Sequence, residues 1–247
     1  MEFYALLVLV ILGLTTVDCY LPPSIIVCHR SDPDLDQCIT DVADKLRPNI
    51  MSGDYGNGTI LPAVDPAYVR RLDIDGGSSL KATFENCTIR GARTFHIDKL
   101  HFNVPKKSIK ILVTLAEMNL TGKYSLNMSI SLLQLDGQGD FTVNTSDVKL
   151  LLKIRYTLHE ADNGRMRLQF LPIDFKVKFA GGVRFYLANL LNGRPELVQA
   201  ANDALNQNPD LLLEKAIPAI RDFFSEMFTT IANGLVRDAY LDEVLPL

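Results

Sequence analysis

The feature that most constrains the fold is a C-terminal segment, residues 209–235, whose apolar residues recur at helical spacing. They cover well over half of the helix circumference and are Leu213, Ile217, Ile220, Phe223, Phe224, Met227, Phe228, Ile231 and Leu235. Asn208 is the expected N-cap and Pro209 the first helical residue. Pro218 lies inside the helix, where it costs one backbone hydrogen bond and favours a kink. A helix that is apolar on so many sides must be enclosed by other parts of the chain.

The segments before this helix alternate apolar and polar residues, the pattern of strands with one buried face. The predicted inner faces carry Leu126, Met128, Ile130 and Leu132, then Leu150, Leu152, Ile154, Tyr156 and Leu158, then Met166, Leu168 and Phe170, then Ile173, Phe175, Val177 and Phe179. The turn EADNG at 160–164 indicates antiparallel neighbours. Parity changes between Phe84 and Cys87, which requires a bulge. From Val183 onward the period is helical, with a short helix within 189–207.

These elements predict an α+β fold in which a curved antiparallel sheet wraps the long C-terminal helix. The sheet could close tightly on the helix, as protein cores normally do. It could also curl more widely and leave an apolar tunnel. The periodicity does not distinguish the two arrangements.

The N-terminus has an apolar run from Phe3 to Leu14, the length of a signal-peptide core and too short to span a bilayer. We predict a signal peptide over residues 1–19, cleaved after Cys19, and one secreted domain over 20–247. The formal net charge of the chain is −4, so no basic field is present to hold nucleic acid. No later segment is long and apolar enough for stable membrane insertion.

Cys28 and Cys38 flank the start of a short amphipathic helix predicted over 33–46, which begins after Asp32. A single helix would hold the two cysteines too far apart, so the chain must turn back before Pro33. In a secreted chain we expect them to form a disulfide. Cys87 is either a buried free thiol or, if cleavage occurs upstream of Cys19, the partner of Cys19 in a second bridge.

The remaining candidate sites are glycosylation triplets and histidines, and they do not form a catalytic or metal-binding motif. Glycosylation triplets occur at Asn57, Asn86, Asn119, Asn127 and Asn144, and the last three should point outward from their strands. The histidines, His29, His96, His101 and His159, have neither the spacing of a metal site nor that of a catalytic motif. We therefore expect no catalytic residue, no metal and no cofactor.

Five motifs occur in a characteristic order along the chain. They are the C-x9-C that contains Asp32–Pro33, LPAVDP at 61–66, FENCTIRGA at 84–92, LTGKYSL at 120–126 and NLLNG at 189–193. Together with the terminal helix, they resemble the insect takeout and haemolymph juvenile hormone-binding family over essentially the whole mature chain. Cys87 and Pro209 depart from that pattern, where we expect Val and Trp respectively.

The resemblance implies a tubular lipid-binding (TULIP-like) fold with an internal apolar tunnel. It implies a monomeric, secreted, non-enzymatic carrier of juvenile hormone, another terpenoid or a fatty-acid-like lipid. The candidate tunnel residues are Leu213, Ile217, Ile220, Phe223, Phe224, Met227, Phe228, Ile231, Met128, Ile130, Leu152, Ile154, Tyr156, Phe170 and Phe175. The alternatives are a secreted lipid or hormone esterase that uses the same pocket, and a ligand-free structural or receptor-interacting domain. The sequence does not identify a receptor.

Overall fold

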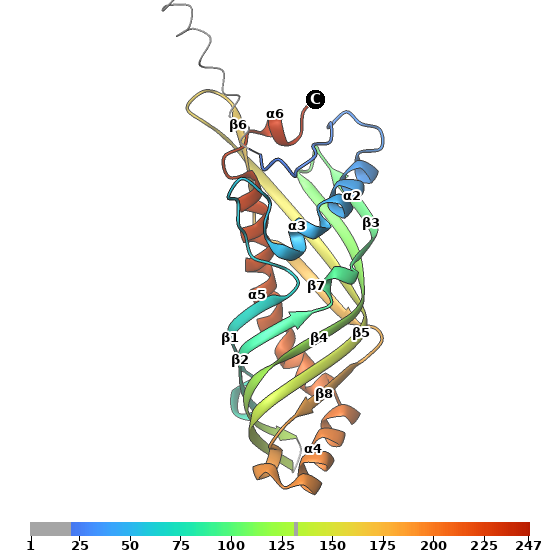
Figure 1. Cartoon of the computed structure of the whole chain (residues 1–247), viewed down its shortest axis with the longest axis vertical. Helices are drawn as coiled ribbons and strands as arrows, with labels where there is room; N and C mark the ends of the chain where they lie inside the picture. The colour runs from blue at the N-terminus through green and yellow to red at the C-terminus, as the bar shows by residue number, and fades with distance from the viewer. Residues whose placement is uncertain (1–20, 131–132) are drawn as a thin grey trace, which may run out of the picture.

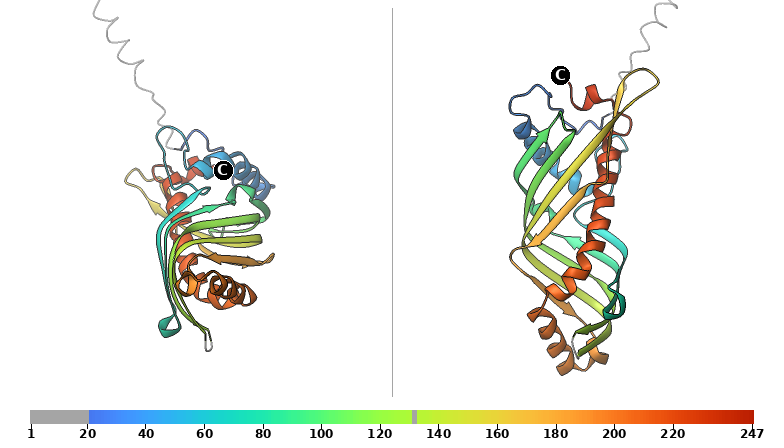
Figure 2. Two further views of the ribbon diagram at one scale, coloured as in Figure 1. Left: turned by 60° about the horizontal axis from the view of Figure 1, so that its bottom comes forward. Right: turned by 180° about the vertical axis from the view of Figure 1, so that it is seen from behind.

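The computed structural model describes residues 21–130 and 133–247 and has an elongated shape, in which a curved antiparallel sheet wraps one long helix (Figure 1). The helices are α2 (Leu35–Lys45), α3 (Arg47–Ser52), α4 (Pro195–Gln207), α5 (Asp210–Val236) and α6 (Leu241–Val244). The strands are β1 (Ala67–Asp75), β2 (Leu80–Arg90), β3 (His96–Asn103), β4 (Ser108–Ile130), β5 (Leu133–Glu160), β6 (Met166–Phe170), β7 (Asp174–Phe179) and β8 (Val183–Leu187). Helix α5 lies along the concave side of the sheet (Figure 2). The predicted α+β fold is therefore confirmed.

Two long strands, β4 and β5, form the frame of the sheet. They have 23 and 28 residues and pair antiparallel from Ser108 opposite Arg155 to Ile130 opposite Leu133. The shorter strands share the outer edges of this pair, with β2 and β3 beside β4, and with β6, β7 and β8 beside β5. The predicted antiparallel meander is thus correct for β4, β5 and β6, whereas β7 pairs with β5 rather than with β6. The first two predicted strands are parts of the longer β4 and β5. Because antiparallel strands alternate, this arrangement turns one apolar face inward along the whole frame.

Local irregularities bend the sheet. The register of β2 against β4 shifts between Glu85 and Thr88, and Asn86 between them has a φ of 52°. This confirms the bulge expected from the parity change. Gly122 lies opposite it, where a Cβ atom would stand 2.9 Å from the Glu85 carbonyl oxygen and 3.0 Å from the Cys87 Cα. A residue without a side chain is needed there because the two strands approach so closely.

Helix α5 begins at Asp210, one residue later than predicted, and continues through Pro218. Asn208 does not cap α5; it instead ends α4, with its backbone N–H bonded to the Leu205 carbonyl. Near its C-terminal end, α5 is hydrogen-bonded to the sheet. Asn233 accepts from the Phe170 N–H at 2.8 Å and donates to the Phe170 carbonyl at 3.0 Å, and Thr229 accepts from the N–H of Ile173.

The prediction of helical structure from Val183 onward was wrong for the first five residues, which form β8. Its sequence, VRFYL, alternates and buries Val183, Phe185 and Leu187. Helix α4 covers the outer edge of β8 through asparagines one turn apart. Asn202 and Asn206 each bond both the N–H and the carbonyl of one β8 residue, Leu187 and Phe185 respectively. These amides take the place of a neighbouring strand, so the edge is satisfied.

The N-terminal segment and the C-terminus meet at one end of the molecule (Figure 1). Cys28 and Cys38 form the predicted disulfide, which packs with Leu35 and Leu245. Arg30 donates from Nε to the Leu245 carbonyl at 3.0 Å. Helix α2 begins at Leu35 rather than at residue 33, because the Asp32 carboxylate accepts from the Asp34 N–H and holds a turn first. The disulfide thus anchors the incoming chain at this end.

At the opposite end, the buried Tyr124 hydroxyl donates to the Ala188 carbonyl at 2.6 Å and ties β4 to the chain after β8. Burial raises the pKa of Tyr124 to about 12, so it remains a donor at physiological pH. Within the described residues, no helix is both long and apolar enough to cross a membrane.

Candidate functional site

The candidate site is a cavity between α5 and the concave face of the sheet. The space that is open to the centre of a water-sized sphere has a volume of about 170 Å³. The surface that its wall exposes to this space is apolar throughout. A cavity that stays open between a helix and a sheet is unusual, because protein interiors normally pack to the density of organic crystals. The sheet therefore does not close tightly on this part of α5, and a continuous tunnel remains a prediction.

Most strands of the sheet, together with α5, contribute residues to the wall of the cavity. The lining residues are Val64, Val69, Leu72 and Ile74 from the first strand and the loop before it, Phe84, Cys87, Ile89 and Ala92 from β2 and the turn after it, Leu115, Met118 and Leu120 from β4, Phe141, Val143, Thr145, Val148 and Leu150 from β5, Phe175, Val177 and Phe179 from β7, Val183, Phe185 and Leu187 from β8, and Leu212, Leu213, Ala216, Ile220, Phe223, Phe224 and Phe228 from α5. We call this part of the molecule the hollow section.

Aromatic rings hold the helix side of the hollow section. Phe224 stands between Phe223 and Phe228, with ring centroids 5.3 and 5.7 Å away. Phe175 of β7 meets both Phe224 and Phe228 edge-on, at 5.9 and 6.1 Å. Such edge-to-face pairs are favourable arrangements of aromatic rings. They fix the helix and β7 around one margin of the cavity.

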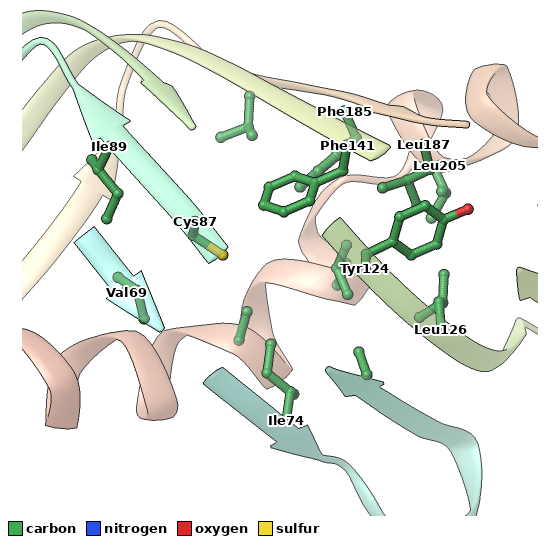
Figure 3. Packing of buried hydrophobic residues seen from close by; sticks show 14 of the residues in the cluster. Val69, Ile74, Cys87, Ile89, Tyr124, Leu126, Phe141, Phe185, Leu187 and Leu205 are labelled. Atoms are coloured by element: carbon green, nitrogen blue, oxygen red, sulfur yellow. The ribbon is translucent and has the colours of Figure 1, made fainter. Parts of the chain in front are cut away.

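The strand side is built from residues that the bulged sheet turns inward. Figure 3 shows the side chains of Val69, Cys87 and Ile89 on one side, and of Phe141 and Phe185 on the other. All five are buried. Residues on β1 and β2 therefore face residues on β5 and β8, although they are far apart in the sequence.

Cys87 is a buried free thiol, the first of its two predicted states, and Cys19 lies outside the described residues. Burial, with a smaller contribution from the Glu85 carboxylate, raises the pKa of Cys87 to about 11. The thiol is therefore protonated at neutral pH and is a poor nucleophile. It contributes to the wall as a small apolar side chain.

Six of the fifteen candidate tunnel residues line the cavity. They are Phe175 on β7 and Leu213, Ile220, Phe223, Phe224 and Phe228 on α5. Helical spacing alone did not separate these from their neighbours on α5. Met227 and Ile231 are buried in the core around the cavity without lining it, and Ile217 is half-buried outside its wall.

The other strand candidates do not line the cavity. Met128 is buried opposite Leu80, and Leu152 packs in a core between β4, β5 and β7. Ile154 is half-buried outside the wall, and the side chain of Ile130 lies outside the described part of the structure.

Tyr156 and Phe170 pack into a separate core beside the disulfide end. Tyr156 meets Phe102 and Phe170 edge-on, at 6.1 and 6.3 Å between centroids. This core also contains Leu168, Val236 and Leu241, and none of its members lines the cavity. We call it the closed section. Tyr156 and Phe170 lie on the inner faces of their strands, as predicted, but they pack into the closed section rather than against the cavity.

The fifteen sequence-based candidates include no wall residue of β1, β2, β4, β5 or β8. Alternation in VRFYL was a usable signal for β8, because Val183, Phe185 and Leu187 all line the cavity. The bulge in β2 interrupts the alternation of that strand, and the buried parity of β1 also changes between Val69 and Ile74. Thr145 was also missed, since a threonine on an inward face of a strand carries no motif.

The remaining candidates are surface residues. All four histidines are exposed, and the His101 ring meets the Asp36 carboxylate at 3.2 Å. Within the described residues, no cluster of three or more His, Cys, Asp or Glu side chains could hold a metal. Asn57, Asn86, Asn127 and Asn144 are exposed, and the half-buried Asn119 donates to Asn144 at 2.8 Å. Glycosylation of these sites remains a prediction.

Three comparisons place the chain among known proteins. Residues 6–246 match the family described as haemolymph juvenile hormone binding protein. The circadian clock-controlled protein daywake of Drosophila melanogaster is 25% identical over 194 residues, which cover 73% of each chain. Daywake of Drosophila yakuba is 24% identical over 135 residues, 55% of this chain and 52% of that protein.

A solved structure shares the fold. Takeout 1 of Epiphyas postvittana superposes with a TM-score of 0.78 over 90% of this chain and 99% of that chain, at 19% sequence identity. At this identity the likeness establishes the architecture alone. It agrees with the curled sheet and long C-terminal helix described above.

Proposed function

We propose that this chain, which belongs to the haemolymph juvenile hormone binding protein family, is a secreted, non-enzymatic carrier of one small hydrophobic molecule. Juvenile hormone, another terpenoid and a fatty-acid-like lipid are the candidate ligands. The observation that carries the proposal is the cavity of the hollow section, whose exposed wall is apolar throughout. Enclosed apolar cavities are the usual sites for small hydrophobic ligands.

The burial of apolar surface supplies enough free energy for a carrier. A ligand that buries about 400 Å² gains roughly 10 kcal/mol at about 25 cal/mol per Å². An association cost of at least about 4 kcal/mol leaves at most about 6 kcal/mol, which corresponds to a dissociation constant of roughly 40 μM. The wall therefore needs no array of polar contacts to retain its ligand.

The chemistry of the wall favours a carrier over an esterase. An esterase needs a nucleophile with a base within hydrogen-bonding reach. The lining side chains of the described chain offer a protonated Cys87 thiol and the Thr145 hydroxyl, with no His, Asp, Glu or Lys among them. Turnover of an ester that is lost when Thr145 or Cys87 is replaced would contradict the proposal.

Secretion is proposed from two features of the N-terminal region. The apolar run Phe3–Leu14 is typical of a signal peptide. The Cys28–Cys38 disulfide fits an oxidising compartment. Recovery of a mature chain that starts at Tyr20 from the medium of expressing cells would support secretion, and retention of the intact chain inside the cells would contradict it.

Titration with an apolar fluorescent probe, displaced by an isoprenoid or a long-chain ester, tests the carrier. Ala216 lines the cavity from α5, so Ala216→Phe should fill part of it and weaken probe binding by more than about tenfold, or about 1.4 kcal/mol. Glu214→Phe places the same ring at an exposed position of α5 and should bind like the wild type. Absence of binding to the wild type, or equal binding by Ala216→Phe with its fold intact by circular dichroism, would contradict the proposal.

A further inference from the structure

Thr145 is a polar residue set in an apolar wall. It lies on β5, its side chain lines the cavity, and it is only 7% exposed. Its Oγ1 is fully buried and has no hydrogen-bond partner among the described residues. Buried hydroxyls nearly always have a partner, because an unpaired one loses its bonds to water without replacement.

The hydroxyl of Thr145 has no counterpart among the described residues of the wall. Among the described lining residues, every other side chain lacks oxygen and nitrogen. The inward residues beside it on β5, Val143 and Val148, show what this wall otherwise uses. A valine has almost the same shape as a threonine and would avoid the cost of an unpaired hydroxyl. Packing alone therefore does not explain why this position of the wall carries a hydroxyl group.

The hydroxyl can reach the cavity by a change of rotamer. The exposed wall is apolar, so Thr145 presents carbon to the cavity while Oγ1 is covered. Staggered side-chain rotamers lie about 120° apart. One such turn about χ1 places the hydroxyl where the methyl stands. In that position it can donate to an acceptor in the cavity.

We propose that Thr145 is the polar anchor of the cavity and donates a hydrogen bond to one uncharged acceptor, a carbonyl oxygen, within a long apolar ligand. This inference rests on the proposed carrier function and narrows the class of ligand.

The position of Thr145 places the acceptor inside the ligand. Along β5 the wall runs from Phe141 to Leu150, with Thr145 four residues from the first and five from the last. At about 3.3 Å per residue, the wall extends roughly 13 Å to one side and 16 Å to the other. A molecule that fills both sides therefore carries its carbonyl near the middle of its length.

The wall also selects against a charged ligand group. No Lys, Arg or His side chain lines the cavity in the described part of the chain. An ionised carboxylate would enter an apolar space without a counter-ion, which is strongly unfavourable. A ketone or an ester meets the requirement of the Thr145 hydroxyl without that cost.

Displacement of an apolar fluorescent probe by three compounds of equal chain length tests the anchor. The compounds are a ketone with its carbonyl at the midpoint, the isomer with its carbonyl next to the chain end, and the alkane. The wild type should bind the midpoint ketone about 3- to 10-fold more tightly than the other two, the size of one net hydrogen bond. Thr145→Val should lose this preference while its affinity for the alkane stays the same or increases.

Two variants control this experiment. Thr145→Ser keeps the hydroxyl and should keep the preference for the midpoint ketone. Thr142→Val removes a hydroxyl from the opposite face of β5, beside Tyr186, and should bind like the wild type. A preference that persists in Thr145→Val, or is absent in the wild type, overturns the anchor and leaves the carrier intact. A wild type that binds neither the probe nor any of the compounds overturns both.

Discussion

The hollow and closed sections are built from the same sheet and the same helix, yet only one is filled. In the closed section, α5 is tied to the sheet by the side-chain hydrogen bonds of Asn233 to the Phe170 backbone. Tyr156 packs between two aromatic rings there. In the hollow section, residues 212–228 of α5 meet the strands through apolar side chains around the cavity.

The difference shows how a protein can keep a cavity without losing a unique structure. Packing in the closed section fixes one end of α5, and the tie from Tyr124 to Ala188 holds the opposite end of the sheet. Between these two points, the bulge in β2 and Gly122 opposite it bend the sheet. The helix can therefore stand away from the strands without collapse, because its C-terminal end is tied to β6 and the sheet is held open around it.

Truncating one aromatic residue in each section should give the largest contrast. Tyr156→Ala removes a buried ring from the closed section and should lower the free energy of unfolding by about 3–5 kcal/mol. Phe224→Ala should cost only about 1–2 kcal/mol, because its ring already borders empty space and has fewer atoms to lose contact with. Urea denaturation measures both. Equal losses would show that the two sections are packed alike.

Loss of the hydrogen bonds between α5 and β6 should have the next largest effect on stability. Asn233→Ala should lower the free energy of unfolding by about 2–4 kcal/mol, because the N–H and the carbonyl of Phe170 both lose their partner. The exposed Glu226→Ala on the same helix should change it by less than about 0.5 kcal/mol. If thermal unfolding finds Asn233→Ala as stable as Glu226→Ala, the closed section is not what holds the helix.

A pH-dependent set of hydrogen bonds joins two segments beside the cavity, at Asp65 and Arg93, which directly follow the wall residues Val64 and Ala92. The Asp65 side chain is 0% exposed and accepts from the backbone N–H groups of Gly91 and Arg93 and from the Arg93 guanidinium. Burial alone would raise the pKa of Asp65, but the bonds from Arg93 and Gly91 outweigh it and hold the pKa below its usual range.

The pKa of Asp65 is lower in the folded state than in the unfolded state, where it is about 4. The stability that the Asp65 carboxylate contributes is therefore fully present above about pH 4 and is lost as the pH falls through the folded-state pKa. Asp65→Asn should therefore cost about 1.5–3 kcal/mol at pH 7 and progressively less below pH 4. Urea denaturation of both proteins across this range measures the difference. A gap that stays constant with pH would show that the Asp65 charge does not contribute.

The smallest expected effect comes from Thr145. In the absence of ligand, Thr145→Val should leave stability unchanged or raise it by up to about 1 kcal/mol, because it removes a buried hydroxyl that has no partner. Thermal unfolding of the lipid-free protein measures this. A loss of more than about 1 kcal/mol would mean that the hydroxyl has a partner in the free protein.

The sequence predicted the elements whose signal is local. Helical spacing identified α5, and the Asp32–Pro33 turn placed the disulfide near a helix. Alternation identified the inner faces of β6, of β7 and of the C-terminal parts of β4 and β5. The N-termini of α2 and α5 were misplaced by one or two residues, because neither helix has the side-chain cap that was assumed. Strand β8 was missed because it is only five residues long and is followed directly by helical segments.

The candidate site was less predictable because a cavity depends on the spacing of elements rather than on the face that a residue occupies. Tyr156 and Phe175 both face inward from their strands, yet one fills the closed section and the other lines the cavity. Their alternation patterns are the same. What separates them is where α5 is tied to the sheet, and Asn233 carries no pattern that reveals its partner in β6.

A crystal structure with a brominated long-chain ester tests the central claim most directly, because the anomalous signal of bromine locates the ligand without assumptions. The account predicts one bromine position within the hollow section, between α5 near Phe224 and the inner faces of β5 and β8 near Val143 and Phe185. Bromine in the closed section among Phe102, Tyr156 and Phe170, or only on the outer surface, would contradict it.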